Sequence, residues 1–231
     1  MMLSACLPPP APRVLKIGLV APFEGHARDL GYDAVYAARL AAREINAGGG
    51  IGGWRVALVA FDDRAEVEMA RIAARNLAID AEVVAVIGHY IPATTEAAGP
   101  IYAEAGLPLV ALGGVAEESF TSPEAEGCFV TPYPFPRDVP GLEAWRADYV
   151  AVGPHVPEPG RAALPTYEAV YVIAEAVADA LAATRGAPSR ASVAAALPAI
   201  RRAGALDFWA EAAPFTYCWE AGQPVLQEVL P

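Results

Sequence analysis

Four short apolar segments, each followed by a helical pattern or a turn, constrain the fold of this chain more than any other feature. They cover residues 15–21, 54–61, 83–88 and 107–112. Continuous apolar runs are typical of strands in parallel sheets whose two faces are both covered by helices. The intervening residues 31–47, 66–79 and 92–105 have the length and composition of helices. We therefore predict an α/β fold with a doubly wound, mainly parallel sheet and helices on both faces.

The first two predicted helices each show apolar residues spaced three and four apart, which is the period of a buried helix face. The two inner faces are predicted to consist of Val35, Ala38, Ala41, Ala42 and Ile45, and of Met69, Ile72, Ala73 and Leu77.

The second half of the chain is less regular. We predict a short strand at 128–131 and helices at 142–152, 164–184 and 189–203, the last with Ser189 as its N-cap. Two strands, 208–219 and 224–230, are expected to form a short C-terminal β-hairpin. Cys128 and Cys218 form either a pair or, more simply, two buried free thiols.

Composition and motifs exclude several classes of function. The net charge is −11 and hydrophobic residues make up 55% of the chain, so a large core can form but a basic face for nucleic acid is absent. The glycine cluster at 48–53 follows a helix and opens a strand, which is the reverse of a phosphate-binding loop. No nucleophile motif or metal-ligand spacing is present, so we expect no enzyme, no cofactor and no metal.

The N-terminus resembles a bacterial lipoprotein signal. Residues 3–6 read LSAC, in which Cys6 would carry the lipid, and the proline-rich residues up to 13 would form a tether. Only two methionines precede this tetrad, whereas a signal peptide needs a charged start and an apolar stretch. Either the true start lies upstream or the match is chance. If the start lies upstream, the chain is lipid-anchored on the periplasmic or extracellular face, with no other membrane contact.

Several long blocks resemble one family. LKIGLVAPFEG, AAREINAGGGIGG, VALVAFDD and VVAVIGH with IYAEAGLPLV are similar to the first lobe of type I periplasmic binding proteins. The closest group is the branched-chain amino acid and amide binders of ABC transporters. GCFVTPYPFP and LPTYEAVYVIAEAVADAL resemble the segment that returns from the second lobe to the first.

The resemblance implies a domain organisation with most of the second lobe missing. Residues 14–116 and 127–205 would form lobe one, 117–126 a loop in place of lobe two, and 206–231 the hairpin. Family members close two lobes on a ligand, so a single lobe implies weak binding or help from a second chain. Partners implied by the resemblance are a small amino acid, amide or carboxylate, an ABC permease and a second copy of this chain.

The resemblance also places the ligand. In the family, a serine at the position of Pro92 receives the ligand carboxylate, a threonine at the position of Val115 meets its ammonium, and an aromatic residue stands at Leu30. This chain lacks both hydroxyls, so we expect the N–H groups of the next helical turn to hold an anion. The full expected binding set is Phe23, Leu30, His89, Tyr90, Pro92, Ala93, Thr94, Thr95, Gly113, Gly114, Val115 and Tyr133.

Other readings of the same residues stay open. Asp62 and Asp63 are expected to be structural, although with His89 they leave a remote enzymatic reading, and His89 itself more often caps or packs. Tyr133 either faces the ligand or covers core. A non-binding dimerisation module, using the alanine-rich helix 164–184 against a twin, is the alternative function.

Overall fold

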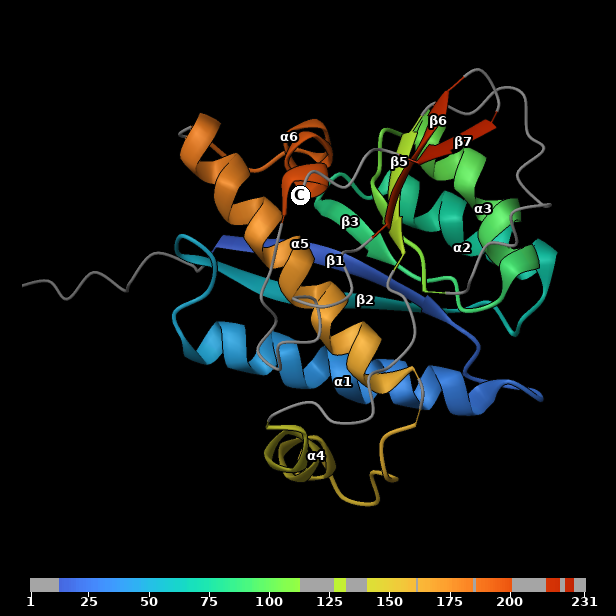
Figure 1. Ribbon diagram of the computed structural model, residues 1–231, viewed down its shortest axis with the longest axis vertical. Coiled ribbons are helices and arrows are strands. Elements are labelled where there is room, and N and C mark those ends of the chain that lie inside the picture. The colour runs from blue at the N-terminus through green and yellow to red at the C-terminus, as the bar shows by residue number, and fades with distance from the viewer. Residues whose placement is uncertain are drawn as a thin grey trace, which may run out of the picture.

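The computed structural model describes residues 13–112, 127–131, 141–160, 162–184, 186–200, 215–220 and 223–226. These residues build one seven-stranded sheet with the order β2-β1-β3-β4-β5-β6-β7 (Figure 1). The strands are β1 (Arg13–Ala21), β2 (Trp54–Asp62), β3 (Val83–Ile87), β4 (Leu109–Val110), β5 (Gly127–Thr131), β6 (Phe215–Glu220) and β7 (Gln223–Leu226).

Strands β1 to β5 run parallel, and this confirms the predicted doubly wound sheet. β1 pairs with β2 along its whole length, from Arg13 opposite Trp54 to Ala21 opposite Asp62. On its other side β1 pairs with β3, which in turn pairs with β4, and β4 with β5. The carboxyl ends of these strands therefore meet at one edge. β6 and β7 are antiparallel to their neighbours, and their connection, 221–222, lies outside the described residues.

Helices cover both faces of the parallel part. α1 (Arg28–Ala47) and α5 (Ala163–Thr184) cross on one face, with α4 (Leu142–Val150) outside α1, as Figure 1 shows. α2 (Val67–Ile79) and α3 (Pro92–Glu104) pack together on the other face. α6 (Arg190–Ala196) and the short 3₁₀ helix Leu197–Ala199 close the α5 side.

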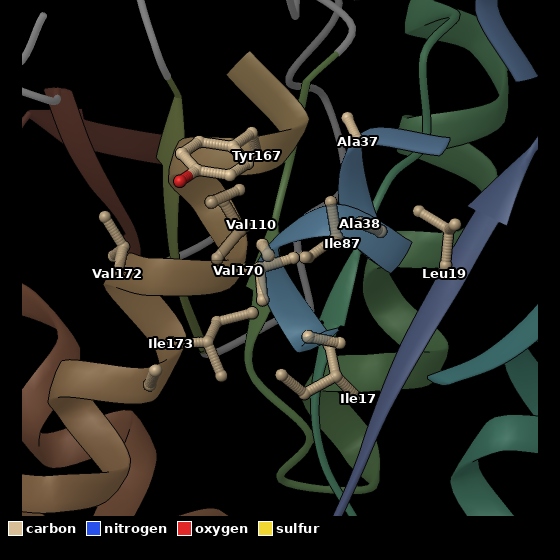
Figure 2. Close-up of a cluster of buried hydrophobic side chains, with 14 of the residues drawn as sticks. Ile17, Leu19, Ala37, Ala38, Ile87, Val110, Tyr167, Val170, Val172 and Ile173 are labelled. Carbon is tan, nitrogen blue, oxygen red and sulfur yellow. The ribbon is translucent and has the colours of Figure 1, made fainter. Parts of the chain in front are cut away.

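Alternation along the strands divides the core into two clusters. Ile17 and Leu19 belong to the cluster on the α1 and α5 side, which Figure 2 shows together with Ala38 of α1 and Val170 and Ile173 of α5. Val20 belongs to the α2 and α3 side. Gly18 also faces α2, since a Cβ placed on it would lie 2.9 Å from a methyl group of Leu77. The missing side chain lets α2 approach the sheet closely.

Two predicted helix faces need correction. On α2 the buried residues are Ala70, Ala73, Ala74 and Leu77, while Ile72 is 40% exposed, because the helix rests on its small residues and turns Ile72 outward. On α5 the alanine-rich surface proposed for a twin is already covered by α1 and α6 of the same chain. The helix starts are closer to expectation: Ser189 caps α6, and its side chain accepts from the N–H of Ser192.

Arg190, the first residue of α6, forms hydrogen bonds that connect the second half of the chain with the first. Its guanidinium donates to four backbone carbonyls, those of Leu77, Asp80, Val83 and Ala105, at 2.7 to 3.3 Å. Two of these oxygens, of Leu77 and Asp80, lie at the end of α2, and that of Ala105 lies at the end of α3, where carbonyls lack partners within the helix. A planar group with five donors fits this task better than an ammonium.

Replacing Arg190 is therefore expected to destabilise the fold. Arg190→Met should lower the free energy of unfolding by roughly 2–3 kcal/mol, because charged donors are lost from partly buried carbonyls. Arg190→Lys should recover less than half of that loss. Thermal unfolding measures both variants. Arg75→Met, which removes an exposed arginine paired with Glu68 at 3.2 Å, is the control and should change stability by less than about 1 kcal/mol. Equal effects at the two positions would contradict the bridging role.

Candidate functional site

The carboxyl ends of β1, β2 and β3 meet at one edge of the sheet, followed by the loops at 22–27, 63–66 and 88–91. In open wound sheets, ligands bind beyond this edge. The polar side chains at the three strand ends divide into those that build the loops and those that line a cavity.

Asp62 and Asp63 build the loops. One oxygen of Asp62 accepts from the N–H groups of Phe23, at 2.8 Å, and Arg64, at 2.9 Å, so it joins the loops after β1 and β2. Asp63 is fully buried and accepts from the N–H of Ala65 at 3.0 Å. Arg64 and Ala65 both have positive φ, 52° and 58°, in the tight turn that these carboxylates stabilise. The structural role expected for the two acids is confirmed.

His89 lies behind the edge, in the core. Its side chain is fully buried, with Nδ1 2.7 Å from Asp63 and Nε2 3.2 Å from the hydroxyl of Tyr102 on α3. Burial raises the pKa of Tyr102, as does the Asp63 carboxylate, so the phenol stays neutral at physiological pH. The three side chains connect β2, β3 and α3. The capping and packing role of His89 thus fits the geometry, and a direct ligand contact does not.

Tyr90 and the two threonines are engaged in a similar way. The hydroxyl of Tyr90 lies 2.7 Å from that of Thr166 on α5. Thr94 and Thr95 are buried, and their N–H groups and their hydroxyls all reach the carbonyl of Ile91. These groups hold the first turn of α3. An anion would therefore not find the free threonine donors expected from the sequence.

The first turn of α3 still offers one donor. Pro92 occupies the first helical position, where its missing N–H leaves nothing unpaired. Ala93 follows and is exposed, and its N–H precedes the first that can bond within the helix. The first turn carries no acidic residue, so the positive end of the helix dipole is not neutralised there.

A cavity of about 590 Å³ lies beside this turn. Its wall comes from the loop before α1, the first turns of α1, the start of α3 and the loop between α4 and α5. The lining residues are His26, Ala27, Asp29, Leu30, Tyr32, Asp33, Ile91, Pro157, Glu158 and Gly160.

Asp33 holds the cavity wall in place. It is 7% exposed, and its two oxygens accept from the N–H of Gly160 at 3.0 Å and of Ala162 at 3.2 Å. A Cβ at Gly160 would overlap one of these oxygens, so a side chain there would displace the Asp33 carboxylate. The carbonyl of Ala162 accepts from Thr166, the partner of Tyr90, and this chain of bonds joins α1, α5 and the end of β3.

Among the described members of the binding set expected from the sequence, only Leu30 lines the cavity directly. Asp33, Glu158 and Gly160 were missed. Asp33 had a signal, because it is a carboxylate within the buried stripe of α1, and such residues are seldom buried without a specific partner. Gly113, Gly114, Val115, Tyr133 and Cys6 lie outside the described residues.

Two features are absent from the described part of the chain. No group of three or more histidine, cysteine or acidic side chains there is arranged to hold a metal ion. Within the same residues, none of the helices combines the length and the apolar character that crossing a membrane requires.

Comparison with known proteins shows which family the first half of the chain resembles. The sequence model described as periplasmic binding protein matches residues 14–124. The chain is 36% identical over 91 residues to an amino acid binding protein of Pseudomonas aeruginosa, which covers 39% of this chain and 24% of that protein. It is 29% identical over 104 residues to the Leu/Ile/Val-binding protein of Escherichia coli, covering 45% of this chain and 28% of that one.

Solved structures show the same fold. The branched-chain amino acid binding protein LivJ of Streptococcus pneumoniae, in complex with isoleucine, gives a TM-score of 0.66 at 16% identity and covers 93% of this chain and 100% of that chain. The leucine binding protein LivK of Thermotoga maritima gives a TM-score of 0.64 at 15% identity, and the match covers 93% of this chain and 98% of that chain.

The expected resemblance is therefore confirmed: residues 14–124 match the model of the periplasmic binding protein family. Its matched relatives include Leu/Ile/Val-binding proteins, which are substrate-binding proteins and not enzymes. The chain matches only about a quarter of the length of these curated relatives.

A substitution of His89 tests whether its buried contact with Asp63 stabilises the fold at the candidate site. His89→Ala should lower the free energy of unfolding by roughly 3 kcal/mol or more, because it leaves a buried carboxylate without its partner. Chemical denaturation measures the change. His155→Asn, which alters an exposed loop histidine, should be nearly neutral. A neutral His89→Ala would contradict the assigned role.

The cavity wall is tested by Asp33→Asn. The amide keeps one acceptor, and its NH₂ group opposes the N–H of either Gly160 or Ala162. We expect a loss of roughly 1–3 kcal/mol and faster proteolysis within residues 153–162. Asp29→Asn, which changes a side chain that is 93% exposed, serves as the control and should show neither effect.

Proposed function

We propose that this chain is a solute-binding protein of an ABC uptake system of the branched-chain amino acid and amide type. It binds a small amino acid, amide or carboxylate at the carboxyl edge of its sheet. The observation that carries the proposal is the cavity of about 590 Å³ at this edge, in a chain whose matched relatives are amino acid binding proteins. Cavities of this size commonly hold small ligands.

The polar groups around the cavity suit a zwitterion. Two positions beyond the lining residue Ile91, the N–H of Ala93 and the dipole of α3 favour a carboxylate, and the acids at the start of α1 favour an ammonium. Leu30 and Ile91 supply apolar wall between them. Because a neutral hydrogen bond contributes only about 1 kcal/mol net, a single lobe of this kind binds weakly. We expect dissociation constants of roughly 0.1–1 mM.

The proposal includes the domain organisation read from the sequence. One lobe, 14–116 with 127–205, carries the site, and 117–126 stands in place of the second lobe. A second copy of the chain would supply the other wall of the cleft and tighten binding. The family supports a periplasmic or extracellular location, with Cys6 as the proposed lipid anchor and an ABC permease as the proposed partner.

Ligand binding is tested by thermal shift with L-amino acids, their amides and small carboxylates at about 10 mM. A ligand of the site should raise the midpoint by roughly 2 °C or more, because it binds only the folded state. Isothermal titration then gives the affinity. If the whole panel is silent while light scattering shows a stable dimer, the alternative of a non-binding dimerisation module replaces this proposal.

The carboxylate position is tested by Ala93→Asp. A negative charge in the first turn stabilises an α-helix by roughly 0.3–1 kcal/mol, but it repels an anion from the same N–H. Affinity for an amino acid that binds the wild type should therefore fall at least about fivefold while the melting temperature stays level or rises. Ala93→Asn has nearly the same shape without the charge and should keep the affinity. Equal affinity in the two variants would place the carboxylate elsewhere.

A further inference from the structure

Two cysteines occupy opposite positions on neighbouring strands of the sheet. β5 pairs with β6 in an antiparallel ladder, and the register sets Cys128 of β5 directly against Cys218 of β6. The pair lies inside the ladder, since further residue pairs follow on both sides of it. Figure 1 shows the two strands side by side, with β7 beyond β6. The fold thus makes neighbours of two cysteines that are far apart in the sequence.

The backbone spacing of such a pair suits a disulfide bond. Residues directly opposite in an antiparallel ladder have Cα atoms about 5.5 Å apart in a hydrogen-bonded pair and about 4.5 Å apart in a non-hydrogen-bonded pair. Disulfides join residues whose Cα atoms are about 4.4–6.8 Å apart, so either kind of pair falls within the range. Diagonal neighbours, at about 7–8 Å, lie outside it. The register of β5 and β6 is therefore the one that allows the bond.

The number of cysteines agrees with a single bond. The chain has three, and the proposed lipid anchor, Cys6, would use one of them. The two that are left are the opposite pair of β5 and β6. The periplasm is an oxidising compartment, in which disulfides form and persist.

We propose that Cys128 and Cys218 form a disulfide bond that joins β5 to β6 in the exported protein. For its oxidant, the inference rests on the proposed periplasmic location. One thiolate attacks a disulfide of the oxidant and gives a mixed disulfide, and the second thiolate then displaces the oxidant and closes the bond. The two cysteines lose two protons and two electrons. The oxidant, a protein or small-molecule disulfide, accepts them and leaves as thiols.

The bond has a structural consequence for the lobe. In the strand order, β6 and β7 reach the parallel strands through β5, so the bond attaches both of them covalently to the sheet. The chain between the two cysteines includes α4, α5 and the loop that forms part of the cavity wall. A bond that closes so long a loop restricts the unfolded chain and thereby stabilises the folded one.

The test is peptide mapping of the full chain with Cys6→Ser, which leaves only the two cysteines of the pair. The folded protein is incubated with oxidised glutathione, unfolded, treated with N-ethylmaleimide and cut with trypsin. Because trypsin cuts after lysine and arginine, one cysteine lies in the peptide 76–137 and the other in 203–231. The expected product is these two peptides joined to each other, obtained from monomeric protein and separated by a reductant.

The matched control is Cys218→Ser/Thr216→Cys in the same background. Thr216 is opposite Val130, so the new thiol is a diagonal neighbour of Cys128 and out of its reach. Both thiols of this variant should react with the maleimide.

Thermal unfolding gives a second readout. The oxidised protein should melt at least about 5 °C above the reduced protein, because the bond lowers the entropy of the unfolded chain. Cys128→Ser/Cys218→Ser should melt like the reduced protein with or without the oxidant. A midpoint that does not respond to oxidation would contradict the inference.

Three results of the mapping would overturn the inference. They are two cysteines that carry maleimide or glutathione after oxidation, a bond that forms only between two chains, and a bond that forms equally well in the control. The chain exported to the periplasm of a bacterial host behind a signal peptide should contain the same joined peptides, and a reduced pair there would also contradict the proposal. No ligand enters these measurements, so their failure leaves the proposed binding intact, and a silent ligand screen leaves the disulfide intact.

Discussion

The candidate site depends on one contact. The buried carboxylate of Asp33 on α1 accepts hydrogen bonds from two backbone N–H groups just before α5. The hydrogen bonds from Gly160 and Ala162 to Asp33 hold the α4–α5 loop against the first turns of α1, and this contact forms part of the cavity wall. The contact suits a carboxylate, because both oxygens accept, and it suits glycine, because a Cβ at Gly160 would displace the carboxylate.

Two further polar contacts join distant parts of the chain in the same way. His89, between Asp63 and Tyr102, connects the ends of β2 and β3 with α3. Arg190 joins α6 to the ends of α2 and α3 through four carbonyl oxygens. In each case a side chain from one element binds polar groups of other elements, which favours one arrangement of the helices and loops around the sheet.

The site that results differs from a closed cleft between two lobes. The donors of Thr94 and Thr95 stabilise their own helical turn, and the polar residues of the cavity lie on α1 and the α4–α5 loop. Within the described residues, the cavity is lined by residues of α1 and the loop before it, by the α4–α5 loop and by Ile91, next to the start of α3.

The sequence by itself determined the parallel sheet, the order of its helices and the cap at Ser189, because apolar periodicity and capping are local properties that each segment carries alone. It also indicated the edge at which ligand would bind, since that follows from the strand order. Only the tertiary structure decided which side chains face that edge. The side chains of His89, Thr94 and Thr95 are buried, whereas Asp33 and Glu158 line the cavity. The position of Asp33 depends on contacts with residues up to 129 positions away in the sequence, which no local pattern contains.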